Sequence, residues 1–302
     1  MTRNFFLYLS QQRRLRRWME TSPIARKLTS RFIAGETLED ALRVSAELQG
    51  QGILTALDHL GENVTTLEEA TASVNAYLRA VDQITARGLP ATISLKATHF
   101  GLDVSEEACY ENVLRVAARA VEMGSRVEID MESTAYTERT IALVIAVARK
   151  VGDIRLAIQA YLFRTPADID RLNQLGIRVR LCKGAYNEPP NLAYPSKADV
   201  DKSYVQLMHT LFDSGTDPAI AGHDDRMIQE AIRYSRERGI TPDRFEFQML
   251  YGIRRDLQRQ VREQGFRLRL YVPYGTAWYP YFMRRLSERP ANVLFVLRSL
   301  FR

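Results

Sequence analysis

The segment from Ala91 to Met131 reads ATISLKATHFGLDVSEEACYENVLRVAARAVEMGSRVEIDM, and its pattern decides the fold. Two short apolar runs, 91–96 and 126–131, flank a stretch over 106–123 that has apolar residues at helical spacing. A helix between two such runs is typical of a unit in which two parallel strands are joined by a crossover helix. The segment therefore predicts a parallel sheet covered by helices.

The same alternation continues in both directions along the chain. Further strands are expected at 52–58, 154–161, 177–182, 219–222, 245–250 and 268–272, and further helices at 66–87, 137–150, 167–175, 200–212, 225–238, 253–264 and 278–286. Eight strand–helix units close a (β/α)8 barrel. An open doubly wound sheet is the alternative, but no Gly-x-Gly-x-x-Gly follows any of these strands. We therefore expect an N-terminal helical extension over residues 1–50 and a (β/α)8 barrel with a C-terminal helix over residues 51–302.

Composition indicates a globular protein in a reducing compartment. Of the 302 residues, 46% are hydrophobic and 26% charged, and no apolar run approaches the ~20 residues of a membrane span. Two cysteines, Cys109 and Cys182, are too few for a disulfide framework. The N-terminus lacks the cleavage site of a secretory signal. We expect a cytoplasmic protein.

Basic residues are spread along the chain and mixed with acidic ones, although the net charge is +6. A nucleic-acid-binding protein is expected to cluster its basic residues, so we predict no nucleic-acid partner. The densest basic stretch, 11–19 (QQRRLRRWM), is interpreted as a solvated helix that packs on the domain. A helix lying on an anionic membrane surface is the alternative that this stretch leaves open.

Ionisable side chains gather where the predicted strands end, at the end of a barrel that carries the active site. They are Asp58, His59, Lys96, His99, Glu128, Asp130, Glu132, Arg180, Lys183 and His223, accompanied by Gln159, Gln248, Tyr271 and Tyr274. Because ionisable groups beside buried strands are costly unless they are paired, so many of them together indicate a functional site.

Two kinds of chemistry remain open for these groups. His59, His223 and Asp130 could converge on a metal ion, but no helix has the two-histidine spacing of a zinc site, so no metal is predicted. Lys96 or Lys183 could form a Schiff base in a barrel lyase. The nearby arginines and acids favour instead a charged lysine held in an ion pair.

The last predicted helix carries Tyr281, Arg284, Arg285 and Glu288 on one face, at spacings of three, four and seven residues. Two adjacent guanidinium groups suit a carboxylate bound through charge-assisted hydrogen bonds, and Glu288 would orient them. A surface helix with an ion pair is the alternative interpretation.

Several of these stretches together resemble the proline dehydrogenase family. The run 177–186 (IRVRLCKGAY) resembles the family's Arg-Leu-x-Lys-Gly-Ala-Tyr motif, and the stretches 247–252 (FQMLYG) and 271–275 (YVPYG) are similar to the same family. The tail Tyr281-x-x-Arg284-Arg285, the run 129–132 (IDME) and the run 58–62 (DHLGE) also match. The resemblance spans roughly residues 57–292 in family order, and the chain length fits the small monofunctional bacterial members.

The resemblance implies a distorted (β/α)8 flavoenzyme that performs the first step of proline catabolism. Its members oxidise L-proline to Δ1-pyrroline-5-carboxylate by hydride transfer to FAD and pass the electrons to a membrane quinone. The quinone implies a peripheral contact with the inner face of the plasma membrane. The alternative to proline oxidation is the activity of a Schiff-base lyase that uses Lys96 or Lys183.

The resemblance also implies roles for individual residues. Arg284, Arg285 and Lys96 are expected to bind the substrate carboxylate, with Tyr271 and Tyr281 beside the ring and Leu250 below it. Asp130 would hold Lys96, and Arg180, near the reactive flavin nitrogen, would stabilise negative charge on the reduced flavin. FAD is expected to contact Met131, Gln159, Arg180, Lys183, Gly184, Ala185, Gly222, His223 and Gln248. Gly222 stands where family members often have threonine.

Overall fold

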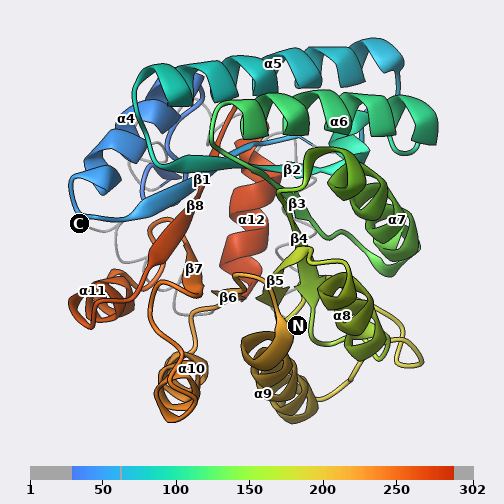
Figure 1. The fold of residues 1–302 in the computed structure, drawn as a ribbon. Helices are drawn as coiled ribbons and strands as arrows, with labels where there is room; N and C mark the ends of the chain where they lie inside the picture. The colour runs from blue at the N-terminus through green and yellow to red at the C-terminus, as the bar shows by residue number, and fades with distance from the viewer. Residues whose placement is uncertain (1–28, 62, 289–302) are drawn as a thin grey trace.

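The chain folds into a closed barrel of eight parallel strands, which confirms the predicted (β/α)8 fold (Figure 1). This computed structural model describes residues 29–61 and 63–288, with backbone only for 284–288. Each strand pairs with the next along the chain, and β8 pairs with β1 to close the ring. The strands are β1 (Leu54–His59), β2 (Ala91–Lys96), β3 (Val127–Asp130), β4 (Ile154–Gln159), β5 (Arg178–Cys182), β6 (Ala219–Ala221), β7 (Glu246–Leu250) and β8 (Leu268–Tyr274).

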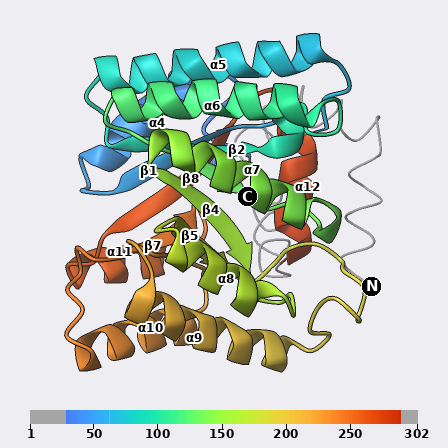
Figure 2. The same cartoon turned by 45° about the vertical axis from the view of Figure 1, so that its right-hand side comes forward.

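Helices surround the barrel, and they follow the strands as the sequence predicts. They are α4 (Leu38–Gln49), α5 (Leu67–Ala86), the short 3₁₀ helix η1 (Ala97–Phe100), α6 (Glu106–Glu122), α7 (Thr134–Val151), α8 (Thr165–Gln174), α9 (Lys197–Ser214), α10 (Asp225–Glu237), α11 (Arg255–Glu263) and α12 (Trp278–Glu288). Figure 2 shows α5 and α6 side by side on one side of the barrel, with α9 and α10 on the other. None of the described helices is long and apolar enough to cross a membrane.

The first residues of the helices agree with prediction where a local side chain caps the helix, and they differ where the capping group is distant in sequence. The hydroxyls of Thr66 and Ser105 accept hydrogen bonds from the first turns of α5 and α6, so these helices begin close to the predicted positions. Helix α7 begins at Thr134, three residues before the predicted start, and the backbone N–H of Thr134 donates to the carboxylate of Glu188 at 2.9 Å. That acceptor comes from a loop more than fifty residues away, so local sequence does not reveal it.

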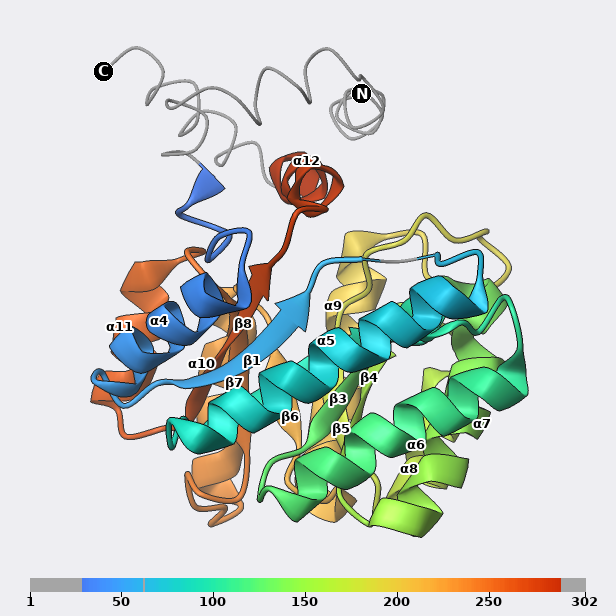
Figure 3. The ribbon, with the colours of Figure 1, turned by 90° about the horizontal axis from the view of Figure 1, so that it is seen from above.

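Helices α4 and α12 lie in different places relative to β8 and β1, since α4 packs on the outside of these two strands. Ala41, Leu42, Val44 and Leu48 of α4 belong to the main apolar core, and α4 contacts both β1 and β8. Helix α12 lies instead at the end toward which β1 and β8 point (Figure 3). The residues preceding position 51 thus supply a helix of the outer layer, while α12 lies at the mouth.

Candidate active site

Lys96 lies at the mouth of the barrel between two aspartates. Its Nζ is 3.7 Å from Oδ1 of Asp58 on β1 and 3.7 Å from Oδ2 of Asp130 on β3. Lys96 and Asp130 are register partners at the last residues of β2 and β3. Parallel strands that end together therefore place three charges, far apart in sequence, in contact.

Asp130 contacts three further side chains besides Lys96. It forms an ion pair with Arg180 of β5, and it accepts hydrogen bonds from the Ser94 hydroxyl at 2.8 Å and the Tyr271 hydroxyl at 2.7 Å. Burial opposes its ionisation, but Arg180 and Lys96 outweigh burial and hold the pKa of Asp130 below its ordinary value. Asp130 is thus an anion throughout the neutral pH range.

Arg180 is buried and held from two sides. Besides Asp130, its guanidinium lies 3.5 Å from Oε2 of Glu128 and 5.7 Å from the centre of the Tyr271 ring. Burial alone would lower the pKa of Arg180, but Asp130 and Glu128 raise it above its ordinary value. Its Nε is buried and has no hydrogen-bond partner among the described residues. A fixed positive charge with one unused donor therefore lies beneath the mouth.

Apolar and aromatic side chains close the site on the side of α12. Leu250 and Tyr271, partners in the register of β7 and β8, pack against a cluster that includes Tyr281 of α12 and Leu60. The structure therefore brings three predicted substrate residues, Leu250, Tyr271 and Tyr281, into one cluster. The side chains of Arg284, Arg285 and Glu288 lie outside the described residues, as does the basic stretch 11–19.

The residues expected to contact FAD lie at the ends of strands β3 to β7. Met131 and Gln159 are buried, and the Gln159 amide donates to the Glu132 carbonyl at 2.9 Å. His223 accepts a hydrogen bond from the Leu250 N–H at 2.9 Å. Gln248 lies 3.4 Å from Arg180 and donates to Glu128 at 2.9 Å.

Lys183, Gly184 and Ala185 begin the loop after β5. Lys183 forms ion pairs with Asp201 and with Asp224, the latter at 3.2 Å. Gly184 has φ +117°, and a Cβ there would overlap the Tyr161 ring. In contrast, a Cβ on Gly222 would meet only the Tyr204 hydroxyl, at 3.8 Å. The loop after β5 therefore needs glycine for close packing, whereas Gly222 leaves room beside it.

Both candidate Schiff-base lysines face carboxylates. A carboxylate favours the charged form of a neighbouring amine, whereas a Schiff-base nucleophile needs the neutral form. The contacts of Lys96 and Lys183 thus favour ion pairing over covalent chemistry. Among the described residues, no group of three histidine, cysteine or acidic side chains is arranged to hold a metal ion.

Deeper in the barrel lies a layer of charges, of which only Glu128 was among the residues predicted at the strand ends. Arg155 and Arg269 share Glu246, and Arg155 also contacts Glu128 at 3.3 Å; Arg155 and Glu128 have no exposed surface. The sequence contained a pattern that could have revealed this layer, because side chains two residues apart on a strand face the same side. The strand-end residues Asp130, Gln248 and Tyr271 are each preceded, two residues earlier, by a charged residue: Glu128, Glu246 and Arg269. This layer supports Arg180 from below through Glu128.

Glu132 and His99, which were predicted at the mouth, make structural contacts with neighbouring residues. The carboxylate of Glu132 accepts hydrogen bonds from the N–H and hydroxyl of Thr98, at 3.1 and 2.7 Å, and so anchors η1. His99 is buried against His59 and Tyr77, with ring centres 5.8 and 6.1 Å away. Burial, followed by the charges of His59 and Lys96, lowers the pKa of His99 to about 3.

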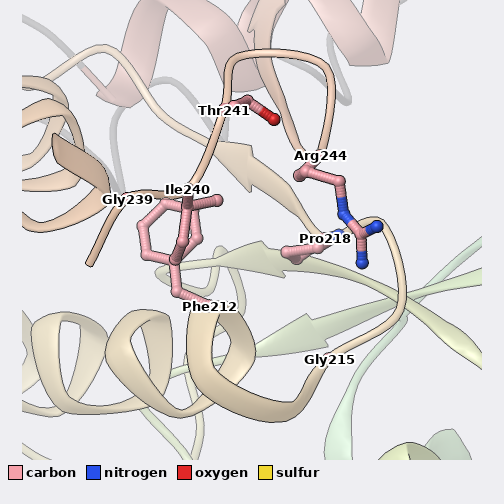
Figure 4. Close-up of a pocket in the computed structure, with 7 residues that line it drawn as sticks. All are labelled: Phe212, Gly215, Pro218, Gly239, Ile240, Thr241 and Arg244. Carbon is pink, nitrogen blue, oxygen red and sulfur yellow. The ribbon is translucent and has the colours of Figure 1, made fainter.

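A separate pocket of about 280 Å³ lies between the loops that precede β6 and β7, with Phe212 and Arg244 on its walls (Figure 4). These loops are at the opposite end of the strands from Lys96 and Asp130. Since barrel enzymes place their chemistry at the carboxyl ends of the strands, this pocket is not the candidate site.

Comparison with known proteins gives the family. The family model described as proline dehydrogenase matches residues 41–298. The chain belongs to the proline dehydrogenase family. This confirms the resemblance drawn from the motifs.

Individual members of the proline dehydrogenase family align over most of this chain. Proline dehydrogenase 2 of Bacillus subtilis is 37% identical, over 99% of both chains. The proline dehydrogenase of Deinococcus radiodurans is 36% identical, over 90% of both. The crystal structure of proline utilization A from Bdellovibrio bacteriovorus superposes with a TM-score of 0.81 at 24% identity and shares the fold. This chain spans about a third of that longer protein, since the match covers 87% of this chain and 32% of the other.

Proposed function

We propose that this member of the proline dehydrogenase family oxidises L-proline to Δ1-pyrroline-5-carboxylate, with FAD as hydride acceptor and a quinone as the final electron acceptor. The observation that carries the proposal is the group Lys96, Asp130, Tyr271 and Arg180 at the mouth of the barrel. It combines a cation for a carboxylate, an aromatic wall for a ring and a fixed charge for an electron acceptor. Relatives named proline dehydrogenase align along nearly the whole chain.

The substrate side of the site suits a small cyclic amino acid. Lys96, together with Arg284 and Arg285, supplies positive charge for the carboxylate. Tyr271, Tyr281 and Leu250 belong to one apolar cluster and would enclose the ring. Asp130 keeps Lys96 charged at the mouth, since an uncompensated buried lysine would be costly.

The residues around Arg180 fit a flavin. The buried Nε of Arg180 is a donor without a described acceptor, and the space beside Gly222 leaves room next to the strand ends. Met131, Gln159, Lys183, Gly184, Ala185, Gly222, His223 and Gln248 would hold the cofactor with Arg180. FAD would accept the hydride from the substrate carbon beside the nitrogen. The fixed charge of Arg180 would stabilise negative charge that develops there, while Asp130 and Glu128 hold the guanidinium in place.

The test is a spectrum of the purified protein. A yellow protein whose flavin band bleaches when L-proline is added without oxygen supports the proposal. A colourless protein that binds no FAD and reduces no dye with proline contradicts it.

Variants of Arg284 and Arg285 in α12 test the substrate assignment separately. Arg284→Ala and Arg285→Ala should each raise the KM for proline by about tenfold or more, which corresponds to the loss of one charge-assisted hydrogen bond, and leave FAD bound. An unchanged KM in both variants would show that the carboxylate is bound elsewhere.

The acceptor and the membrane contact need their own assay. Removal of residues 1–20 should lower quinone reduction on anionic vesicles and spare reduction of a soluble dye, if the basic stretch 11–19 contacts the membrane. Equal loss of both activities would place the effect in the barrel.

A further inference from the structure

Asp58 is a second carboxylate partner of Lys96, and it has no role in the function proposed above. It is the penultimate residue of β1, and its side chain is 1% exposed, compared with 14% for Asp130. Its Oδ1 lies as far from Lys96 Nζ, 3.7 Å, as the nearest oxygen of Asp130 does. Lys96 therefore contacts one deeply buried carboxylate and one nearer the mouth.

The surroundings of Asp58 make its negative charge energetically costly. A carboxylate removed from water is costly unless a cation compensates it, and among the described side chains Lys96 is a cation in contact with Asp58. Tyr77 and Tyr274 lie nearby: after burial itself, the negative charge of Asp58 is the largest cause that raises the pKa of each. Phenol groups of this kind stay neutral and do not replace the lysine.

Asp130 alone would hold Lys96 in a different place. Asp130 also binds Arg180, Ser94 and Tyr271, so its oxygens are shared among several donors. A lysine attracted by Asp130 only would move toward it and compete with Arg180 and Tyr271. An equal attraction from Asp58 keeps the ammonium group between the strands. Around Lys96 the described elements present the titratable or charged groups Asp58 from β1, Asp130 from β3, Arg180 from β5, Tyr271 from β8 and His99 from η1.

We propose that Asp58 is a positioning residue for substrate binding, which keeps Lys96 protonated and centred at the mouth so that its ammonium group can bind a carboxylate. The proposal rests on the proposed function, because it assumes that Lys96 binds the substrate. It predicts a pH effect, since removal of one of two neighbouring anions makes the lysine lose its proton at lower pH.

The experiment uses the FAD-loaded enzyme and cyclopentanecarboxylate, a ring carboxylate without a nitrogen. This probe stays ionised from pH 7 to 10, so any change in its affinity over that range comes from the protein. Calorimetric titrations compare the unaltered enzyme with Asp58→Asn. We expect the variant to lose affinity for the probe at a pH about one unit lower than the unaltered enzyme does. The same pH dependence in both proteins overturns the proposal.

Two further variants separate positioning from a general structural effect. Asp168→Asn removes another buried carboxylate that is paired with an arginine, Arg164, on the outer helix α8, and it should leave the pH dependence unchanged. Asp58→Glu keeps the charge and should restore the affinity above pH 8 at least in part. A shift in Asp168→Asn as large as in Asp58→Asn would overturn the proposal.

If Asp58→Asn does not fold, the double variant Asp58→Asn/Lys96→Gln shows whether Asp58 is needed to compensate Lys96 or to stabilise the barrel itself. A folded double variant shows that Asp58 compensates Lys96, which supports the proposal. A double variant that does not fold shows that Asp58 serves the barrel itself, which overturns it. The proposed function fails in a different way, because then the unaltered enzyme neither binds the probe nor oxidises proline.

Discussion

The Tyr271 hydroxyl on β8 donates a hydrogen bond to Oδ2 of Asp130 on β3, at 2.7 Å across the barrel. The same Tyr271 ring lies 5.7 Å from the Arg180 guanidinium. Tyr271 therefore contacts Asp130, which pairs with Lys96 and Arg180, and also forms part of the wall of the proposed substrate pocket. Changes at Tyr271 should therefore affect substrate binding and catalysis together.

Tyr271→Phe removes this hydrogen bond and keeps the ring. Because hydrogen bonds to a charged group contribute about 1.5–3 kcal/mol, we expect kcat/KM for proline to fall about tenfold or more, with FAD retained. Tyr136→Phe is the matched control, since it removes an exposed hydrogen bond of the same length, 2.7 Å, from Tyr to Asp103. Steady-state kinetics of both variants provide the check, and equal kinetics in the two would contradict the role of Tyr271.

The charged layer inside the barrel predicts a large effect on stability. Glu246→Gln leaves Arg155 and Arg269 with one buried counter-charge fewer, and breaking such a buried pair costs about 3–5 kcal/mol. Denaturant unfolding should show this loss. Glu39→Gln, which breaks the exposed pair with Arg87, should leave the unfolding midpoint unchanged. A small effect at Glu246 would mean that Glu128 compensates both arginines alone.

His99 predicts a loss of stability in acid. Its pKa is about 3 in the folded chain, because of burial and then the charges of His59 and Lys96, and about 6.5 when unfolded. Between these values the unfolded chain binds the extra proton, so the free energy of unfolding falls as the pH falls below about 6.5. The expected contribution at pH 5 is about 2 kcal/mol. His99→Gln should remove this part of the slope, and an unaltered slope from pH 7 to 5 would refute the assignment.

Gly184→Ala tests the loop after β5. A Cβ at Gly184 would overlap the Tyr161 ring, and its φ of +117° is itself unfavourable for alanine. We expect the loop to move and the FAD content of the purified protein to fall severalfold. Gly176→Ala is the control, because Gly176 has φ +66° with nothing within 4 Å of an added Cβ. It should cost about 1 kcal/mol of stability through backbone strain and leave FAD content unchanged. The same FAD loss in both variants would assign the effect to strain alone.

Strand and helix positions were largely predictable because they follow from local periodicity. The strand Ala91–Lys96 has the predicted bounds, and β5 and β7 begin within one residue of prediction. Strand β8 continues to Tyr274, two residues past its predicted end, because Tyr274 pairs with His59 where the barrel closes. The extra length of β8 depends on a pairing partner more than two hundred residues away, and a local sequence pattern does not reveal such a partner.

By itself the sequence determined the alternation of strands and helices, the charged residues at the strand ends and the family motifs. All of these depend on residues near one another along the chain. Tertiary structure alone decided that Lys96 lies between Asp58 and Asp130, that Glu132 turns to Thr98, and that α12 lies at the mouth while α4 covers β8 and β1. The physical reason is that a spacing of two tells which side chains face the barrel interior, whereas their partners are set by strand register and by closure of the ring.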